Sequence, residues 1–372
     1  MTTVVVAGAV ANKPGNAGEA WVRMSWVEGL RRSGLDAWFV EELSTARWGE
    51  ASPACIEWFR TVTERFGIAE RAALVDADTG VLLHGTASLP EGELLVNISG
   101  HARRPALLAS CRRRAYVDLD PGYTQIWHVQ GADLGLAHHD THFTVGLNVG
   151  RPGCAVPDAG YRWTPVLPPV VLDDWPALPP LPVDRFTTVG SWRGGFGPVE
   201  HDGVRYGVKA HELRRLLALP ALVPATLELA LDIHPGDHAD RSRLLEHGWR
   251  LVDPAEVAGD PDRFRAYVQG SAAELSVAQG VYVGTHSGWF SDRTARYLAS
   301  GRPALVQDTG LRGHLPVGAG LVTFATIDEA VAGAAGICAH HEEHAAAARH
   351  LAEQHLDAAR VLPRFLEQAG VS

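Results

Sequence analysis

Residues 274–310, ELSVAQGVYVGTHSGWFSDRTARYLASGRPALVQDTG, contain the densest group of side chains suited to binding an anion. The stretch reads as an apolar strand, a loop of small residues, a helix beginning near Asp292, a Gly-Arg-Pro turn and another strand. Hydroxyl and imidazole groups gather where the first strand gives way to the helix: His286, Ser287, Gly288 and Ser291. Ligands of parallel sheets bind at the carboxyl ends of strands, and helix N–H groups attract anions. The pattern therefore predicts a site for a diphosphate.

Two further residues are candidates for accepting a proton during a reaction. His101 closely follows the apolar run 94–98, at the carboxyl end of a predicted strand, and an imidazole titrates near neutral pH. Asp120 is the second candidate. The alternative for His101, one of 18 histidines, is a surface or structural role.

Two patterns offer metal ligands, and both favour another interpretation. Asp118 and Asp120 form a DxD pattern, but the Pro121-Gly122 pair that follows favours a turn. Residues 138–142, HHDTH, crowd their ligands into one loop with no distant carboxylate to complete a zinc site. We therefore predict a turn, a solvated polar loop and no bound metal.

Lysine is rare in this chain, which has only Lys13 and Lys209 beside 31 arginines. An ammonium is compact and fits where the guanidinium fork of Arg does not. The two lysines thus deserve notice as candidate ligand contacts, and the bias toward Arg, Ala and Gly is typical of a GC-rich bacterial genome.

The composition argues against several classes of protein. Apolar residues make up 46% and charged residues 20%, an ordinary balance for a globular chain of 372 residues. The apolar runs fall short of the roughly 18 to 20 residues of a membrane-spanning helix, and the start, MTTVVVAGAV, lacks a basic leader. A net charge of −10 disfavours nucleic acid and anionic membranes as partners. Four scattered cysteines form no disulfide or zinc pattern, so we expect a reduced, cytoplasmic protein.

The elements that must position these residues alternate between strand and helix. A β-branched run at 3–6 precedes a loop with Gly15 and Gly18, a helix with apolar residues at helical spacing, and a strand at 37–43. Apolar runs at 94–98 and 115–119, separated by a helical stretch at 104–113, continue the pattern. This order predicts an α/β domain with a parallel sheet and a glycine loop ahead of its first helix.

A proline-rich segment divides the chain into two such domains. We place the linker at 169–184, after an N-terminal domain of residues 1–168. The alternation restarts in a C-terminal domain, residues 185–345, with strands predicted at RFTTVGSW, ATLELALDI, WRLVDP, GVYVGTHSGWF and PALVQDT. Residues 346–372 predict a terminal helix that packs back across the domains. The fold class is α/β, with two Rossmann-like domains and a cleft between them.

The motifs around the predicted diphosphate site resemble those of GT-B glycosyltransferases. Residues 285–291, THSGWFS, are similar to the Thr-His-Cys-Gly-Trp-Asn-Ser motif of plant natural-product transferases, in which the His and Ser hold the donor diphosphate. Residues 299–303, ASGRP, match the Gly-x-Pro turn of that family, and Gln307-Asp308 resembles its sugar-contacting pair. The resemblance implies a two-domain enzyme that binds a nucleotide-sugar in its C-terminal domain.

The same resemblance assigns roles to residues outside that stretch. Ser191 matches a phosphate-contacting residue and Lys209 a lysine that neutralises the diphosphate, while Gly15 and Gly18 match a glycine loop near the acceptor. The implied donor site is Ser191, Lys209, His286, Ser287, Gly288, Ser291, Asp292, Arg293 and Asp308. The implied catalytic residues are His101 and Asp120.

One expected residue is missing. The ribose-binding Glu of the family falls at Thr294 when the motif is aligned on His286, and at Arg296 when it is aligned on Gly301. The paired-Glu signature of retaining members is absent as well. Asp292 is the candidate replacement, with a helix N-cap as its alternative role.

Taken together, these features predict a glycosyltransferase that needs neither metal nor cofactor. It would move a sugar from a nucleoside diphosphate sugar to a small-molecule or glycan acceptor, in specialised metabolism or at a cell surface. Two alternatives remain open. A nucleotide-sugar 2-epimerase shares the architecture and would place paired carboxylates around the sugar, whereas a non-catalytic nucleotide-binding protein would fit the missing Glu.

Overall fold

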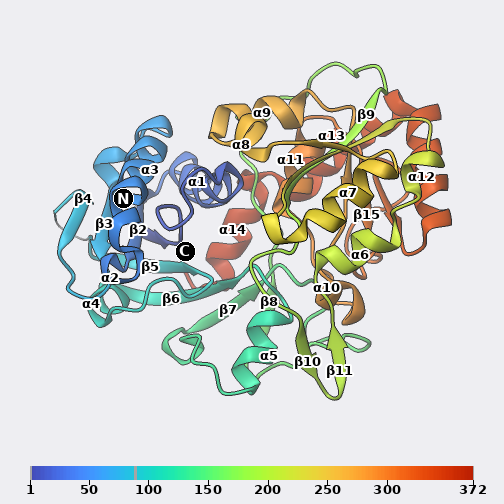
Figure 1. Ribbon diagram of the computed structural model, residues 1–372. Coiled ribbons are helices and arrows are strands. Elements are labelled where there is room, and N and C mark those ends of the chain that lie inside the picture. Colours follow the sequence, from blue (N-terminus) through green and yellow to red (C-terminus); the bar gives the residue numbers. More distant parts are fainter. Residues whose placement is uncertain (1, 88–89, 372) are drawn as a thin grey trace.

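The computed structural model describes residues 2–87 and 90–371. Two lobes lie side by side, each built around one sheet (Figure 1). Blue to green segments form the first lobe and yellow to red segments the second, except that the red helix at the C-terminus lies beside the first lobe. Within the described ranges, no helix is both long and apolar enough to cross a membrane.

The first sheet has eight strands and is parallel except at one edge. Its spatial order is β4 (Leu82–Gly85), β3 (Ala72–Asp76), β2 (Asp36–Leu43), β1 (Thr3–Ala7), β5 (Gly92–Ile98), β6 (Cys111–Asp118), β7 (Thr141–Thr144) and β8 (Trp163–Pro165). Only β4 runs antiparallel to its neighbour. The strand order reverses direction between β1 and β5, as in doubly wound sheets.

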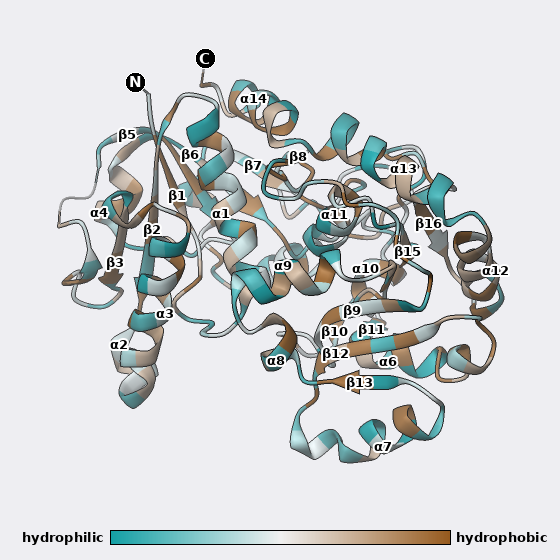
Figure 2. Cartoon of the chain, turned by 90° about the horizontal axis from the view of Figure 1, so that it is seen from above, coloured by the Kyte–Doolittle hydropathy of each residue, from teal (hydrophilic) through white to brown (hydrophobic). Residues whose placement is uncertain are grey.

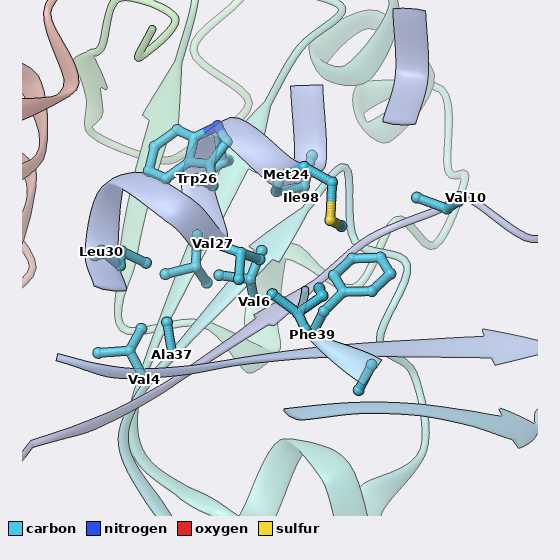
Figure 3. Close-up of a cluster of buried hydrophobic side chains, with 14 of the residues drawn as sticks. Val4, Val6, Val10, Met24, Trp26, Val27, Leu30, Ala37, Phe39 and Ile98 are labelled. Atoms are coloured by element: carbon cyan, nitrogen blue, oxygen red, sulfur yellow. The ribbon is translucent and has the colours of Figure 1, made fainter. Parts of the chain in front are cut away.

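Helices cover both faces of this sheet because its central strands are apolar on both sides. Along β1, Val4 and Val6 pack against α1 (Ala17–Arg32), as Figure 3 shows with Met24, Val27 and Phe39 around them. The same cluster contains apolar residues of α3 (Ser52–Arg65). Val5 lies on the opposite face with α4 (Pro105–Ala109). The short helices α2 (Thr45–Trp48) and α5 (Tyr123–Val129) complete the lobe.

The second sheet has six strands and is parallel throughout. Its order is β13 (Arg250–Val252), β12 (Thr226–Asp232), β9 (Arg185–Ser191), β14 (Ala273–Ser276), β15 (Ala304–Gln307) and β16 (Leu321–Phe324). One face packs on α9 (Pro261–Gln269), α11 (Asp292–Ala299) and α13 (His341–Leu351). The other packs on α6 (Lys209–Arg215), α7 (His238–Glu246) and α12 (Ile327–Ala339). The helices α8 (Pro254–Ala258) and α10 (Gly280–Gly284) and the hairpin β10 (Val199–His201) with β11 (Val204–Tyr206) lie in its connections.

Two helices tie the lobes together. The start of α1 enters the second lobe, where Trp21 contacts Trp175 and donates a hydrogen bond to the carbonyl of Pro261. The last helix, α14 (Ala358–Gln368), returns to the first lobe, where Phe365 packs on Trp26 and Phe143 with ring centroids 4.9 and 4.5 Å away. Figure 2 shows α14 beside the first sheet, near both chain ends.

The elements differ from the sequence predictions in four places. The terminal helix predicted over 346–372 is not continuous: α13 begins at His341, a π-helical turn spans Ala352–Leu356, and α14 starts anew because Asp357 caps it. Residues 280–284 form α10 and not a strand, because β14 already occupies the place beside β9 and Gly280 packs on the backbone of Gly207. The predicted helix 104–113 ends at Ala109, since Cys111 already pairs with Gly92 in the sheet. Gly18 lies in the first turn of α1 and not in the loop before it, because Asn16 caps the helix.

Candidate functional site

Each sheet offers a ligand site at the point where its strand order reverses. In the first lobe, β1 and β5 are followed by residues 8–16 and 99–104; in the second, β9 and β14 are followed by residues 192–198 and 277–279. Ligands of open α/β sheets bind at such positions. Most of the predicted site residues lie at these two points.

Two cations meet beside the end of β9. A Cβ placed on Gly190 would lie 3.5 Å from Nζ of Lys209 and 3.6 Å from Nη1 of Arg293, so the two cationic groups flank this glycine. Lys209 is the first residue of α6, and within the described residues its Nζ forms no ion pair. Burial, together with the nearby Arg293, lowers the pKa of Lys209 to about 7. An ammonium without an ion-pair partner, next to a guanidinium, can bind an anion.

Arg293 is held in place by three hydrogen bonds to strands of the second sheet. Its Nε donates to the buried carboxylate of Glu274 at 2.6 Å, and its Nη atoms donate to the carbonyl of Val189 and the hydroxyl of Ser276, each at 2.8 Å. Burial opposes its charge, but the pairing with Glu274 outweighs that effect and raises the pKa of Arg293. Its charge is therefore permanent and its position fixed.

The glycine-rich turn after β9 is shaped by Ser191 and Gln279. The hydroxyl of Ser191 accepts the N–H of Gly194 at 3.0 Å. The amide of Gln279 accepts the N–H of Lys209 at 2.7 Å and donates to the carbonyl of Arg193 at 3.2 Å. Gly194 has φ +87°, and a Cβ there would lie 1.9 Å from the Gln279 amide nitrogen. Gln279 thus links the turn to the start of α6.

The N-terminus of α11 points to the same region. The hydroxyl of Ser291 accepts the N–H of Arg293 at 3.2 Å, so Ser291, rather than Asp292, is the N-cap. Asp292 pairs with Arg296 at 3.0 Å and its side chain is 37% exposed. Arg296 is buried and also donates to the hydroxyl of Ser25 in α1. Of the two positions aligned with the expected Glu, Thr294 is buried and Arg296 carries a structural cation.

The THSGWFS segment faces the first lobe. The carbonyls of Ser287 and Gly288 accept the N–H groups of Asn148 and Leu147 at 3.0 and 3.2 Å. The hydroxyl of Ser287 donates to the carbonyl of Tyr282 and accepts the N–H of Trp289, so it serves the loop itself. A Cβ on Gly288 would lie 2.8 Å from the nitrogen of Asn148, which explains glycine at this contact.

His286 and Asp308 lie close to that contact. His286 has an exposed side chain and φ +50°, and its carbonyl accepts from the side-chain amide of Asn148 at 3.0 Å. The same amide donates to Gly310 at 2.8 Å, and its oxygen lies 2.7 Å from Nε2 of His314. Asp308 follows β15 and accepts the N–H groups of Gly310 and Leu311. Asn148 thus bridges the lobes through three groups.

Asp120 belongs to the first lobe and contacts the second lobe. Its Oδ1 accepts a hydrogen bond of 2.8 Å from the hydroxyl of Tyr282 in α10. Burial raises the pKa of Asp120 to about 6, against the lowering effect of the Tyr282 hydrogen bond. Asp118 is fully buried and accepts the N–H of Asp120 together with three side-chain donors, from Thr124, Gln125 and Thr144. Asp118 therefore shapes a turn, and that turn presents Asp120.

His101 shares its charged surroundings with Asp120. Burial, with Arg23 and Lys13 nearby, lowers the pKa of His101 to about 3. Lys13 pairs with Glu19 at 2.5 Å, and Arg23 pairs with the same carboxylate. Burial opposes ionisation of Glu19, but the two cations prevail and lower its pKa to about 2. Because a general base works best when its pKa lies near the operating pH, this geometry favours Asp120 over His101.

The glycine loop of the first lobe is anchored by a buried carboxylate. Glu41, at the end of β2, accepts the N–H groups of Val10, Ala11 and Asn12 at 2.7, 2.7 and 3.1 Å. Gly15 is exposed with φ +78°, whereas a Cβ on Gly18 would lie 3.6 Å from the ring of Phe264 in the second lobe. Gly15 thus belongs to the cleft loop, and Gly18 to the contact between lobes.

The histidine loop is a correction to the sequence analysis. His139 and His142 are buried, so the predicted solvated loop is wrong at these positions. His139 uses both ring nitrogens, at 2.9 Å from the carbonyl of Gly135 and 3.0 Å from the amide of Asn97, and His142 bonds to the carbonyl of Leu136. Among residues 2–87 and 90–371, no group of three or more His, Cys, Asp or Glu side chains is arranged to hold a metal ion.

Comparison with known proteins bears on the arrangement as a whole. No protein-family model and no curated protein matches the sequence. Among solved structures, HepE of Anabaena in complex with UDP and glucose is similar over the full length of both chains, with 12% identity and a TM-score of 0.59. The chain has the GT-B fold.

Two further structures show the GT-B fold at similar distance. AviGT4, a glycosyltransferase involved in avilamycin A biosynthesis, is 14% identical over 100% of this chain and 97% of its own, with a TM-score of 0.54. An α-glucosyltransferase in complex with UDP and a 13-mer DNA is 9% identical over 99% of each chain, with a TM-score of 0.58. These likenesses confirm the predicted GT-B architecture with its two Rossmann-like domains.

Sequence reasoning missed several residues of the GT-B cleft. Tyr282, Gln279 and Asn148 make the contacts described above, yet they are uncharged or amide side chains without a spacing signal. Glu41 lies in the predicted strand 37–43, but only the fold shows that it closes on the glycine loop. Lys13 is different, because its rarity as one of only two lysines marked it as a candidate ligand contact in the sequence.

Proposed function

We propose that this protein is a glycosyltransferase that moves a sugar from a nucleoside diphosphate sugar to a hydroxyl or amine of a small-molecule or glycan acceptor. The arrangement of three charged groups carries the proposal. Among the described residues, Lys209 has no ion-pair partner, and it flanks Gly190 together with the fixed Arg293 in the second lobe. Asp120, in the first lobe, has a pKa raised to about 6. Cations for a departing diphosphate and a base for the incoming acceptor are the two groups that such a transfer requires.

The donor diphosphate binds between these cations and the N-terminus of α11, capped by Ser291. Ser191 and Gln279 hold the turn that borders this space, and Asp292 offers a partly exposed carboxylate for the ribose hydroxyls. His286 and Asp308 face the sugar end, near the contact between the lobes. Ser287 and Gly288 shape that contact. Charge compensation by Lys209 and Arg293 makes a divalent metal unnecessary in this proposal.

The chemistry is a displacement at the anomeric carbon. The acceptor oxygen or nitrogen forms the new bond to that carbon while the bond to the diphosphate oxygen breaks and its electron pair leaves with the nucleotide. Asp120 takes the acceptor proton through its free carboxylate oxygen. His101, neutral near pH 7, borders the acceptor space together with Lys13 and the loop that carries Gly15.

The deciding experiment incubates the protein with UDP-, GDP- and TDP-sugars and a panel of acceptors, and measures free nucleoside diphosphate and glycosylated product by mass spectrometry. Product formation that persists in EDTA supports the proposal. Conversion of the donor sugar without an acceptor would indicate the epimerase alternative. Nucleotide binding without any turnover would indicate a passive binder.

A further inference from the structure

One hydroxyl crosses the cleft to reach the candidate base. Tyr282 comes from α10 of the second lobe, is 3% exposed, and donates to Oδ1 of Asp120 at 2.8 Å. Its ring stacks on Trp289 with centroids 4.7 Å apart and meets Tyr123 edge to face at 6.0 Å. The ring is thus fixed by packing, and its hydroxyl oxygen lies within hydrogen-bond distance of Asp120.

We infer that Tyr282 is a positioning residue of the reaction, whose hydroxyl orients the Asp120 carboxylate when the two lobes are closed. This inference rests on the proposed glycosyltransferase function. Because one carboxylate oxygen accepts from Tyr282, the other is left for the acceptor proton. When the lobes separate, Asp120 loses this donor, so the base is set only in the closed enzyme.

The other groups around Asp120 do not replace this contact. Asp118 raises the proton affinity of Asp120, as does Glu19 in α1, whereas Lys13 in the first loop lowers it. The remaining titratable neighbours are phenols, whose own pKa values are raised by burial and by Asp120: Tyr116, Tyr123 and Tyr282. Of these, Tyr282 alone donates a hydrogen bond to Asp120 among the described residues.

Tyr123 provides a matched control in the same aromatic cluster. It is fully buried, and within the described residues its hydroxyl has no hydrogen-bond partner. Tyr123→Phe therefore removes a buried hydroxyl from this cluster without removing a bond. Tyr282→Phe removes the same atom and one bond to Asp120.

The experiment measures kcat and KM against pH for the wild-type enzyme, Tyr282→Phe and Tyr123→Phe. Loss of a hydrogen bond to the ionised carboxylate favours its protonated form, so the acid limb of kcat in Tyr282→Phe should move up by about one pH unit. At pH 6 this lowers kcat by several-fold, whereas the donor KM stays within about twofold. Tyr123→Phe should follow the wild-type profile.

The possible results separate this inference from the function on which it rests. Two results would overturn the positioning role and leave the transferase function intact. In the first, both variants transfer the sugar and the acid limbs of their kcat profiles coincide. In the second, kcat of Tyr282→Phe falls by the same factor at every pH. Absence of transfer by the wild-type protein with every donor would overturn the function itself. A shifted limb in Tyr123→Phe as well would show that cluster packing, not the hydrogen bond, sets the base.

Discussion

In the proposed donor site, Lys209 is the residue on which we expect binding to depend most. Its ammonium is unpaired beside Arg293, so Lys209→Ala should weaken binding of UDP-glucose by about 10- to 100-fold, as expected for a lost charge-assisted hydrogen bond of roughly 1.5–3 kcal/mol. Calorimetry measures this change directly. The matched control is Lys13→Ala, which changes the only other lysine and should leave donor affinity nearly unaltered. Equal affinity of Lys209→Ala and wild type would remove Lys209 from the site.

The same residue predicts a pH dependence of binding. In the free protein the pKa of Lys209 is about 7, and a bound diphosphate favours the charged form. Below pH 7 the ammonium is already present, so affinity is highest there. Above pH 7 binding must take up a proton, and affinity should fall by up to about tenfold per pH unit. Titrations with UDP-glucose at pH 6 and pH 9 check this, and Lys209→Ala should be insensitive over the same range.

The electrostatic surroundings of Asp120 and His101 give the two candidate bases different pKa values. A pKa of about 6 suits Asp120 as a base near neutral pH, whereas a pKa of about 3 makes His101 a weak one. Asp120→Asn should therefore lower kcat by about 10² to 10⁴, and His101→Ala by less than about tenfold. Donor affinity, measured by calorimetry, should change little in either variant. A larger loss in His101→Ala would reverse this assignment.

At the scale of elements, the turn after β9 shows how the fold constrains a ligand site. Gly194 has φ +87°, and a side chain there would clash with Gln279, whereas nothing lies within 4 Å of a Cβ on Gly195. Gly194→Ala should cost about 1–3 kcal/mol of local strain and weaken UDP-glucose binding, while Gly195→Ala should do neither. Chemical denaturation and calorimetry of both variants test this. Similar behaviour of the two would show that the turn is not fixed.

The elements also show what the sequence could and could not reveal. The alternation of strands and helices can be predicted because buried strands such as 3–6 and 94–96 carry continuous β-branched or apolar runs. Residues 280–284 have the same character but form α10, since a short apolar run does not distinguish strand from helix without its neighbours. The pairing of Tyr282 with Asp120 joins residues 162 positions apart, so no local pattern could predict it.

At the scale of the whole molecule, the lobes are joined on two sides with different roles. On one side, α1 and α14 bury large aromatic rings in shared cores and form a permanent connection. On the other, Asn148 and Tyr282 make polar contacts between the lobes, beside a buried cluster that contains Tyr123, Val281 and Tyr282. Apolar cores resist opening because exposing them is costly, whereas a few hydrogen bonds exchange readily with water. We therefore expect the hydrogen bonds of the second side to exchange first when the proposed enzyme opens to admit a donor.

This division predicts the behaviour of an Asn148 variant. The Asn148 side chain donates to the carbonyls of His286 and Gly310 and lies 2.7 Å from His314, so Asn148→Ala removes three contacts between the lobes. The closed form should lose about 1–3 kcal/mol relative to the open form. The neighbouring exposed Arg151 supplies the control, because Arg151→Ala leaves the side-chain bridge of Asn148 in place.

Small-angle X-ray scattering with and without UDP-glucose measures the opening. We expect a larger radius of gyration for free Asn148→Ala than for wild type or Arg151→Ala, and contraction of all three on binding the donor, since the donor contacts remain. The free energy of unfolding of the first lobe should change little, because its core with α14 is untouched. If Asn148→Ala scatters like the wild type in the free state, the bridge does not hold the lobes closed, and closure must then depend on the other contacts, which include Tyr282, the apolar cluster around it and the backbone hydrogen bonds of Leu147, Asn148 and Ala155.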